Sequence, residues 1–100
     1  MNQLEKKTFK DLDQMLSEIA DKFFFAKKMQ GKDSLDDFND YIYKVQTAYE
    51  TLNDNERNLI NNEFFYQSYQ EWWKPLYSKA SFYRYKKEAM AKFLGAFYGL

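Results

Sequence analysis

The basic side chains of residues 78–100 are the group in this sequence best suited to binding an anionic partner. They are Lys79, Arg84, Lys86, Lys87 and Lys92, and Glu88 is the only acid among them. Residues 1–53 carry eight lysines against ten acids, and residues 54–77 carry two cations against four acids, so the chain as a whole is neutral. Cationic side chains gathered in one segment are suited to phosphate oxygens, which makes this asymmetry more informative than the neutral sum.

The same segment has the periodicity of an amphipathic helix, which Ser78 would cap. At about 100° per residue, one side of this helix collects Phe82, Tyr85, Ala89, Phe93 and Ala96. The opposite side collects Ala80, Tyr83, Arg84 and Lys87, with Lys79 and Lys86 on the flank. We therefore predict that the helix packs by its aromatic side and leaves its cationic side free.

A helix with this division of labour is typical of one that enters the major groove of DNA. Arg84 suits bidentate contact with guanine, and Ala80 is small enough to approach a thymine methyl group. Ser78 and the free N–H groups at the helix start suit a phosphate. Phosphate contacts are also expected from Lys79, Lys86 and Lys87. The alternative, that this is the solvated basic face of an ordinary terminal helix, stays open at this point.

Residues 52–94 resemble the helix-turn-helix of sigma-factor region 4. LNDNERNLI at 52–60 has the leucine, the polar turn and the Glu-Arg pair that precede a helix in that family, and 77–94 is similar to its recognition helix. The Tyr-Ser-x-x-x-Phe-Tyr-Arg-x-Lys-Lys pattern is more similar still to phage late-transcription regulators of the ArpU and RinA type. This resemblance implies that Lys79, Ala80, Tyr83 and Arg84 face the groove and that Lys86 or Lys87 meets the DNA backbone.

The spacing of apolar residues predicts an all-α fold of about five helices in a single domain, 1–100. An antiparallel helical hairpin is expected at 8–52, with Thr8 and Ser34 as helix caps. A helix-turn-helix module is expected at 53–98, with an Asn53–Glu56 capping box, a helix to about Tyr66, a short helix to Trp73 and a recognition helix at 78–94. Of the adjacent Trp72 and Trp73, one is expected beneath the last helix and the other at its rim.

Several classes of function are excluded or disfavoured by what the sequence lacks. Without Cys or His, disulfides, zinc sites of the usual ligand types and a histidine proton shuttle are excluded. The acids Asp33, Asp36, Asp37 and Asp40 decorate a helix start, and no phosphate-binding glycine loop accompanies them. No membrane-length apolar run or secretory signal is visible, so we expect a cytoplasmic protein.

The sequence thus predicts a DNA-binding transcriptional regulator that is not an enzyme and needs no cofactor or metal, with double-stranded DNA as its partner. The alternative is a helical protein-interaction module that no longer binds DNA. Such a module would be an adaptor to RNA polymerase or a scaffold that forms a homodimer.

Overall fold

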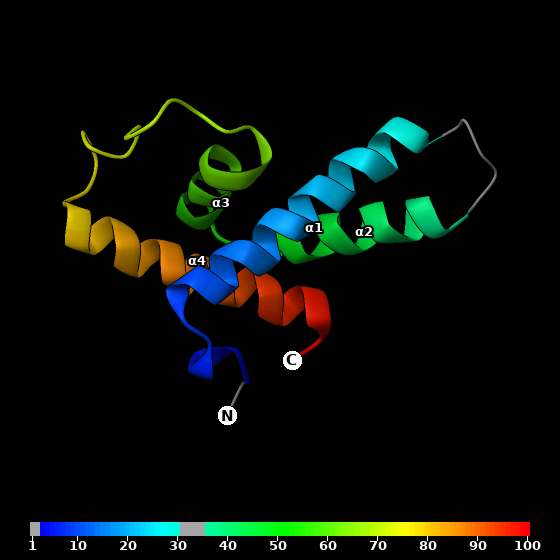
Figure 1. The fold of residues 1–100 in the computed structure, drawn as a ribbon, viewed down its shortest axis with the longest axis horizontal. Coiled ribbons are helices and arrows are strands. Elements are labelled where there is room, and N and C mark those ends of the chain that lie inside the picture. Colours follow the sequence, from blue (N-terminus) through cyan, green and yellow to red (C-terminus); the bar gives the residue numbers. More distant parts are fainter. Residues whose placement is uncertain (1–2, 31–35) are drawn as a thin grey trace.

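All regular elements that the computed structural model describes, over residues 3–30 and 36–100, are helical (Figure 1), as predicted. A short 3-10 helix, Gln3–Lys6, precedes four α-helices and a π-helical turn. The elements that follow it are α1 (Phe9–Met29), α2 (Asp36–Glu50), α3 (Asp54–Ile60), the π-helical turn (Asn61–Phe65) and α4 (Lys79–Tyr98). No helix in this part of the chain is both long enough and apolar enough to cross a bilayer.

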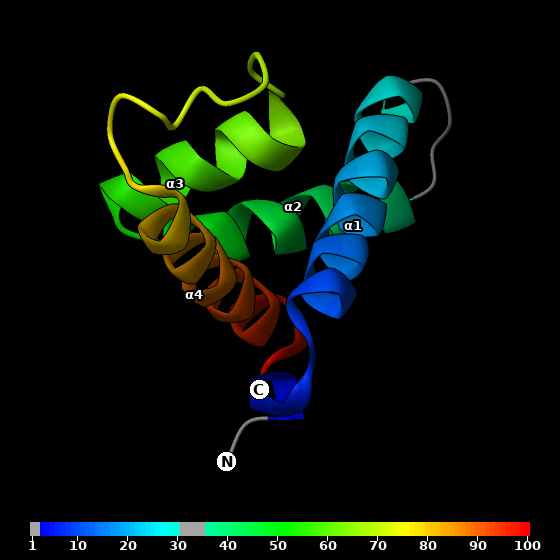
Figure 2. The same cartoon turned by 60° about the vertical axis from the view of Figure 1, so that its left-hand side comes forward.

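Helices α1 and α2 are consecutive and pack against each other, but in Figure 2 they cross steeply instead of lying side by side along their lengths as in the predicted antiparallel hairpin. The start of α1 follows from local chemistry, because the Thr8 hydroxyl accepts from the Asp11 N–H at 3.1 Å and Asp11 accepts from the Thr8 N–H at 3.2 Å. Leu12, Leu16 and Ile19 then recur at helical spacing and are buried. The predicted cap of the second helix, Ser34, lies outside the described residues.

The start of α3 links that helix to both of its neighbours. The predicted capping box is confirmed, with Asn53 and Glu56 exchanging backbone-to-side-chain hydrogen bonds of 2.8 and 2.9 Å. Glu56 also accepts from Lys92 of α4 at 2.9 Å. Arg57 donates to the carbonyl of Glu50 at 2.7 Å, which satisfies an acceptor left open at the end of α2.

Residues 61–78 correct the prediction of about five helices. The third helix passes into the π-helical turn, and residues 66–78 form turns instead of the short helix expected to end at Trp73. Glu71 has a φ of 63°, in the left-handed region that an α-helix does not use, and Pro75 lacks the N–H that a helix interior needs. A helix-turn-helix joins its helices through a turn of about 3–4 residues, so these thirteen residues depart from the expected module.

The two tryptophans of this segment anchor it to α4 as expected. Trp72 is buried and meets the Phe82 ring edge-on, with centroids 6.1 Å apart. Trp73 is half-buried and stacks on the same ring at 4.6 Å, with only 9° between the planes. The rings therefore hold the irregular segment against the first half of α4.

The core face of α4 is rotated from the predicted one. Phe82, Ala89 and Phe93 are buried as expected, whereas Tyr85 and Ala96 are exposed. Their places in the core are taken by Lys86, Met90 and Phe97. On a helical wheel a charged residue such as Lys86 is assigned to the solvent side. The sequence pattern therefore included Tyr85 in the core face and left Lys86 outside it.

Lys86 is buried because two carboxylates from distant segments neutralise it. Only 8% of the residue is exposed. Its Nζ donates to Glu63 Oε1 at 2.8 Å and to Asp13 Oδ2 at 3.0 Å. The ammonium also lies over the rings of Phe9 and Phe64, 5.3 and 5.2 Å from their centroids. A buried charge is tolerated when it is paired and hydrogen-bonded in this way.

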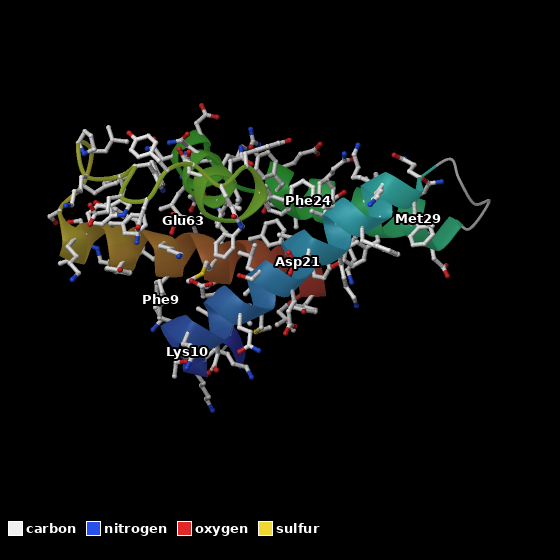
Figure 3. The ribbon with its side chains drawn as sticks, turned by 45° about the horizontal axis from the view of Figure 1, so that its top comes forward. Phe9, Lys10, Asp21, Phe24, Met29 and Glu63 are labelled. Carbon is white, nitrogen blue, oxygen red and sulfur yellow. The ribbon has the colours of Figure 1, made fainter. Side chains whose placement is uncertain are left out.

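Glu63 also connects the Lys86 ion pairs to residues 66–78. Its second oxygen, Oε2, accepts from the Trp72 indole N–H at 2.8 Å. Figure 3 shows Glu63 and Phe9 approaching α4 from opposite sides. One ammonium group thus connects α1, the π-helical turn, residues 66–78 and α4.

Replacing Lys86 with Met should destabilise the fold, because Asp13 and Glu63 would keep their charges without a counterion. Breaking one partner of a buried pair costs roughly 3 kcal/mol, and urea denaturation measures the loss. Lys87→Met is the matched control: this neighbour is exposed and unpaired within the described residues, so the change should stay within about 0.5 kcal/mol. Equal unfolding midpoints for the two variants would contradict the assigned role of Lys86.

Stability should also fall in alkaline solution. Burial lowers the pKa of Lys86, but hydrogen bonds to Glu63 and Asp13 outweigh it and raise the pKa above the ordinary 10.5. Burial and the nearby Tyr98 raise the pKa of Tyr41 from 10.0 to about 12. Both groups bind their proton more tightly in the folded state, so their contribution is complete below about pH 10 and is lost as the pH rises toward 12.

Unfolding free energies measured from pH 8 upward should therefore decline above about pH 10. Tyr41→Phe removes the tyrosine contribution and should make the decline shallower. A wild-type stability that stays level to pH 12 would show that neither group is linked to folding.

Candidate nucleic-acid interface

The first half of α4 begins as the sequence predicts. Ser78 has extended backbone angles, and its hydroxyl accepts from the Ser81 N–H at 3.2 Å. The helix continues to Tyr98, beyond the predicted end near Leu94, and stops at Gly99, whose φ of 71° suits glycine. Gly95 is helical and buried, so it does not end the helix.

The predicted groove-facing side of α4 is largely open to solvent. Lys79, Ala80, Arg84 and Lys87 are exposed, and Tyr83 is 43% exposed. Across residues 3–30 and 36–100, the cations Lys79, Arg84 and Lys87 form no ion pair. The Arg84 guanidinium lies over the Tyr85 ring, 5.0 Å from its centroid. A phosphate could therefore bind these cations without first breaking an ion pair within the protein.

Lys86 does not belong to this surface. The prediction counted it among the phosphate-binding lysines, on the flank of the helix. The structure corrects this, because the Lys86 ammonium is bound to Glu63 and Asp13 inside the protein and is not available to DNA. The error has the same origin as the rotated core face.

Two recesses border the first half of α4. One, of about 800 Å³, lies toward residues 66–77 and is lined in part by Trp73, Lys79 and Tyr83. The other, of about 530 Å³, lies toward α3 and is lined in part by Ser81, Tyr85 and Glu88. Between them Ala80, Arg84 and Lys87 form a ridge, which we call the α4 ridge. A ridge with a recess on each side has the shape that a groove in a duplex accepts.

The sequence did not indicate that the start of the chain would lie beside this ridge. The Phe9 ring meets Tyr83 of α4 edge-on, with centroids 5.4 Å apart. The 3-10 helix also packs on α4, and in Figure 3 Lys10 lies at the lower edge of the molecule, below the middle of α4. Lys6, Lys7 and Lys10 are all exposed there. Summing charge over the whole of 1–53 concealed this local cluster.

The described residues contain no group of three or more metal-ligating side chains of the His, Cys, Asp or Glu type placed to hold a metal ion. Two of the acids nearest α4, Asp13 and Glu63, are already bound to Lys86. The exposed surface along the first half of α4 consists of cations, a small side chain and aromatic rings.

The similarity of residues 52–94 to sigma-factor region 4 and to regulators of the ArpU and RinA type stays a prediction. Compared with protein-family models, with curated proteins and with solved structures, the chain has no match in any of the three.

Proposed function

We propose that this protein is a transcriptional regulator that binds double-stranded DNA by placing the α4 ridge in the major groove. The observation that carries the proposal is the ridge itself: the cations Arg84 and Lys87 are exposed on one side of α4 and form no ion pair within residues 3–30 and 36–100. Arg84 would read a guanine, Lys79 and Lys87 would bind phosphates, and Ala80 would allow close approach to a base edge. A helix is about 10–12 Å across with its side chains, which fits a major groove about 12 Å wide.

The support behind the ridge also favours this role. The opposite side of α4 contributes Phe82, Met90 and Phe93 to the core, each no more than 2% exposed. Lys86 fixes the same half of the helix to α1 and to the π-helical turn. A recognition element that is already rigid loses little conformational entropy on binding, so its contacts contribute more fully to affinity.

Reversing the charges of the ridge should weaken binding strongly. Arg84→Glu with Lys87→Glu is expected to weaken binding to a duplex at least about tenfold, measured by fluorescence anisotropy in about 50 to 200 mM salt. Lys22→Glu with Lys28→Glu is the matched control, since it changes the charge equally at exposed positions in the second half of α1. A wild-type protein that binds no duplex at low salt, or two double variants of equal affinity, would refute the proposal.

A second candidate function, self-association as a dimerising scaffold, is favoured by aromatic side chains at the other end of the molecule. Phe24, Phe25 and Tyr66 are 43, 57 and 76% exposed. Beside them a recess of about 470 Å³ is lined in part by Phe23, Phe65 and Tyr66. Because the chain has no net charge, a second copy would approach this surface without overall repulsion.

Light scattering over a range of concentrations tests this second candidate. A dimer that is lost in Phe24→Asp with Phe25→Asp, and kept in Tyr69→Asp, would support it, because Tyr69 is also exposed, at 71%, but lines the recess beside Trp73 and Lys79 instead. A monomer at every concentration would dismiss self-association through these aromatics. Capture of RNA polymerase by a monomer would instead favour the adaptor alternative.

A further inference from the structure

We infer that the start of the chain supplies a second set of phosphate contacts and so decides on which side of α4 the DNA backbone runs. The surface consists of Lys6, Lys7, Lys10, Lys79 and Lys87, which we call the α1–α4 basic face. The inference rests on the proposed function, because it specifies how the duplex that meets the α4 ridge is held.

The lysines at the start of the chain stand on an anchored backbone. Leu4 of the 3-10 helix is only 3% exposed and belongs to the core. Phe9 contacts Tyr83 and also lies beneath the Lys86 ammonium. Two apolar anchors therefore bracket Lys6 and Lys7, and Lys10 directly follows the second anchor.

The start of α1 lies against the first half of α4, because the Phe9 ring meets Tyr83 with centroids 5.4 Å apart. Lys10 follows Phe9 directly, and Lys6 and Lys7 precede it by three and two residues. With α4 seated in a major groove about 12 Å wide, these three lysines would lie near a flanking phosphate strand.

The two sides of α4 differ in the acids that lack a partner. On the α1 side, Asp13 is bound to Lys86, and Glu71, which lines the recess beside Lys79, is bound to Lys74. Asp11 stays charged, because hydrogen bonds from the side chain and the backbone of Thr8 hold its pKa below the usual value. On the α3 side, the recess is lined by Glu56, which is bound to Lys92, and by Glu88, which forms no ion pair in the described part of the chain. At the start of the chain Lys6, Lys7 and Lys10 outnumber Glu5 and Asp11, whereas Glu88 would repel a phosphate on the α3 side.

The test compares two triple variants of the full chain on one duplex. Lys6→Gln, Lys7→Gln and Lys10→Gln remove three charges from the basic face. Lys22→Gln, Lys27→Gln and Lys28→Gln remove three exposed charges from the second half of α1, away from its start. Each phosphate contact adds about 0.9 to the slope of log affinity against log salt. The first variant should therefore lower the slope by roughly 2 to 3 and weaken binding about tenfold or more.

The outcomes separate this inference from the proposed function. Weaker binding and a lower slope in the first triple alone, with wild-type thermal unfolding in both, would support the basic face. If the two triples bind equally while Arg84→Glu with Lys87→Glu abolishes binding, the inference is wrong and the proposed function stands. If wild type binds no duplex at low salt, both are wrong.

A smaller change examines the other side of α4. Glu88→Gln removes an exposed acid from the α3 side, and affinity should rise slightly if the backbone is near enough to feel its charge, or stay the same if it is not. Weaker binding in Glu88→Gln would place the duplex on the α3 side and overturn the inference.

Discussion

One buried ammonium group, that of Lys86, holds together segments that would otherwise have little reason to meet. Its partners Asp13 and Glu63 belong to α1 and the π-helical turn, and Glu63 passes the connection on to Trp72. The aromatic rings of Phe9 and Phe64 close around it. A charge in such a place is destabilising unless every partner is present, so the arrangement selects one relative placement of these segments over others.

The same ion pairs shape the outer surface. By binding Asp13 and Glu63, Lys86 neutralises two acids that lie close to the first half of α4. Lys79 and Lys87 are exposed, and neither forms an ion pair with an acid in the described part of the chain. The ion pairs of Lys86 thus bury one cation of α4 and, by neutralising Asp13 and Glu63, leave the exposed Lys79 and Lys87 of the same helix unpaired in the described residues.

Local features could be read from the sequence, and contacts between distant residues could not. The caps at Thr8, Asn53 and Ser78 were predictable because donor and acceptor are three residues apart. Lys86 was misplaced because its partners lie 73 and 23 residues away, and no helical wheel contains them. The left-handed backbone at Glu71 could not be predicted, because the residue at this position is not a glycine. The prediction of a short helix to Trp73 was therefore wrong. The lysines at the start of the chain were missed because a tertiary contact, Phe9 with Tyr83, brings them to α4.

The π-helical turn at Asn61–Phe65 has a consequence for how the chain tolerates insertions and deletions. A π-helical turn bonds each residue to the fifth one along instead of the fourth, so it holds one more residue than an α-helical turn. Removing a single residue there would convert it to an α-helical turn of nearly the same rotation, so the side chains beyond it would keep their directions while those inside it would be displaced. Glu63 lies inside the turn and bonds to both Lys86 and Trp72, so a deletion that displaces it would strain both contacts. The contacts made from within the turn, more than the course of the chain beyond it, therefore depend on its length.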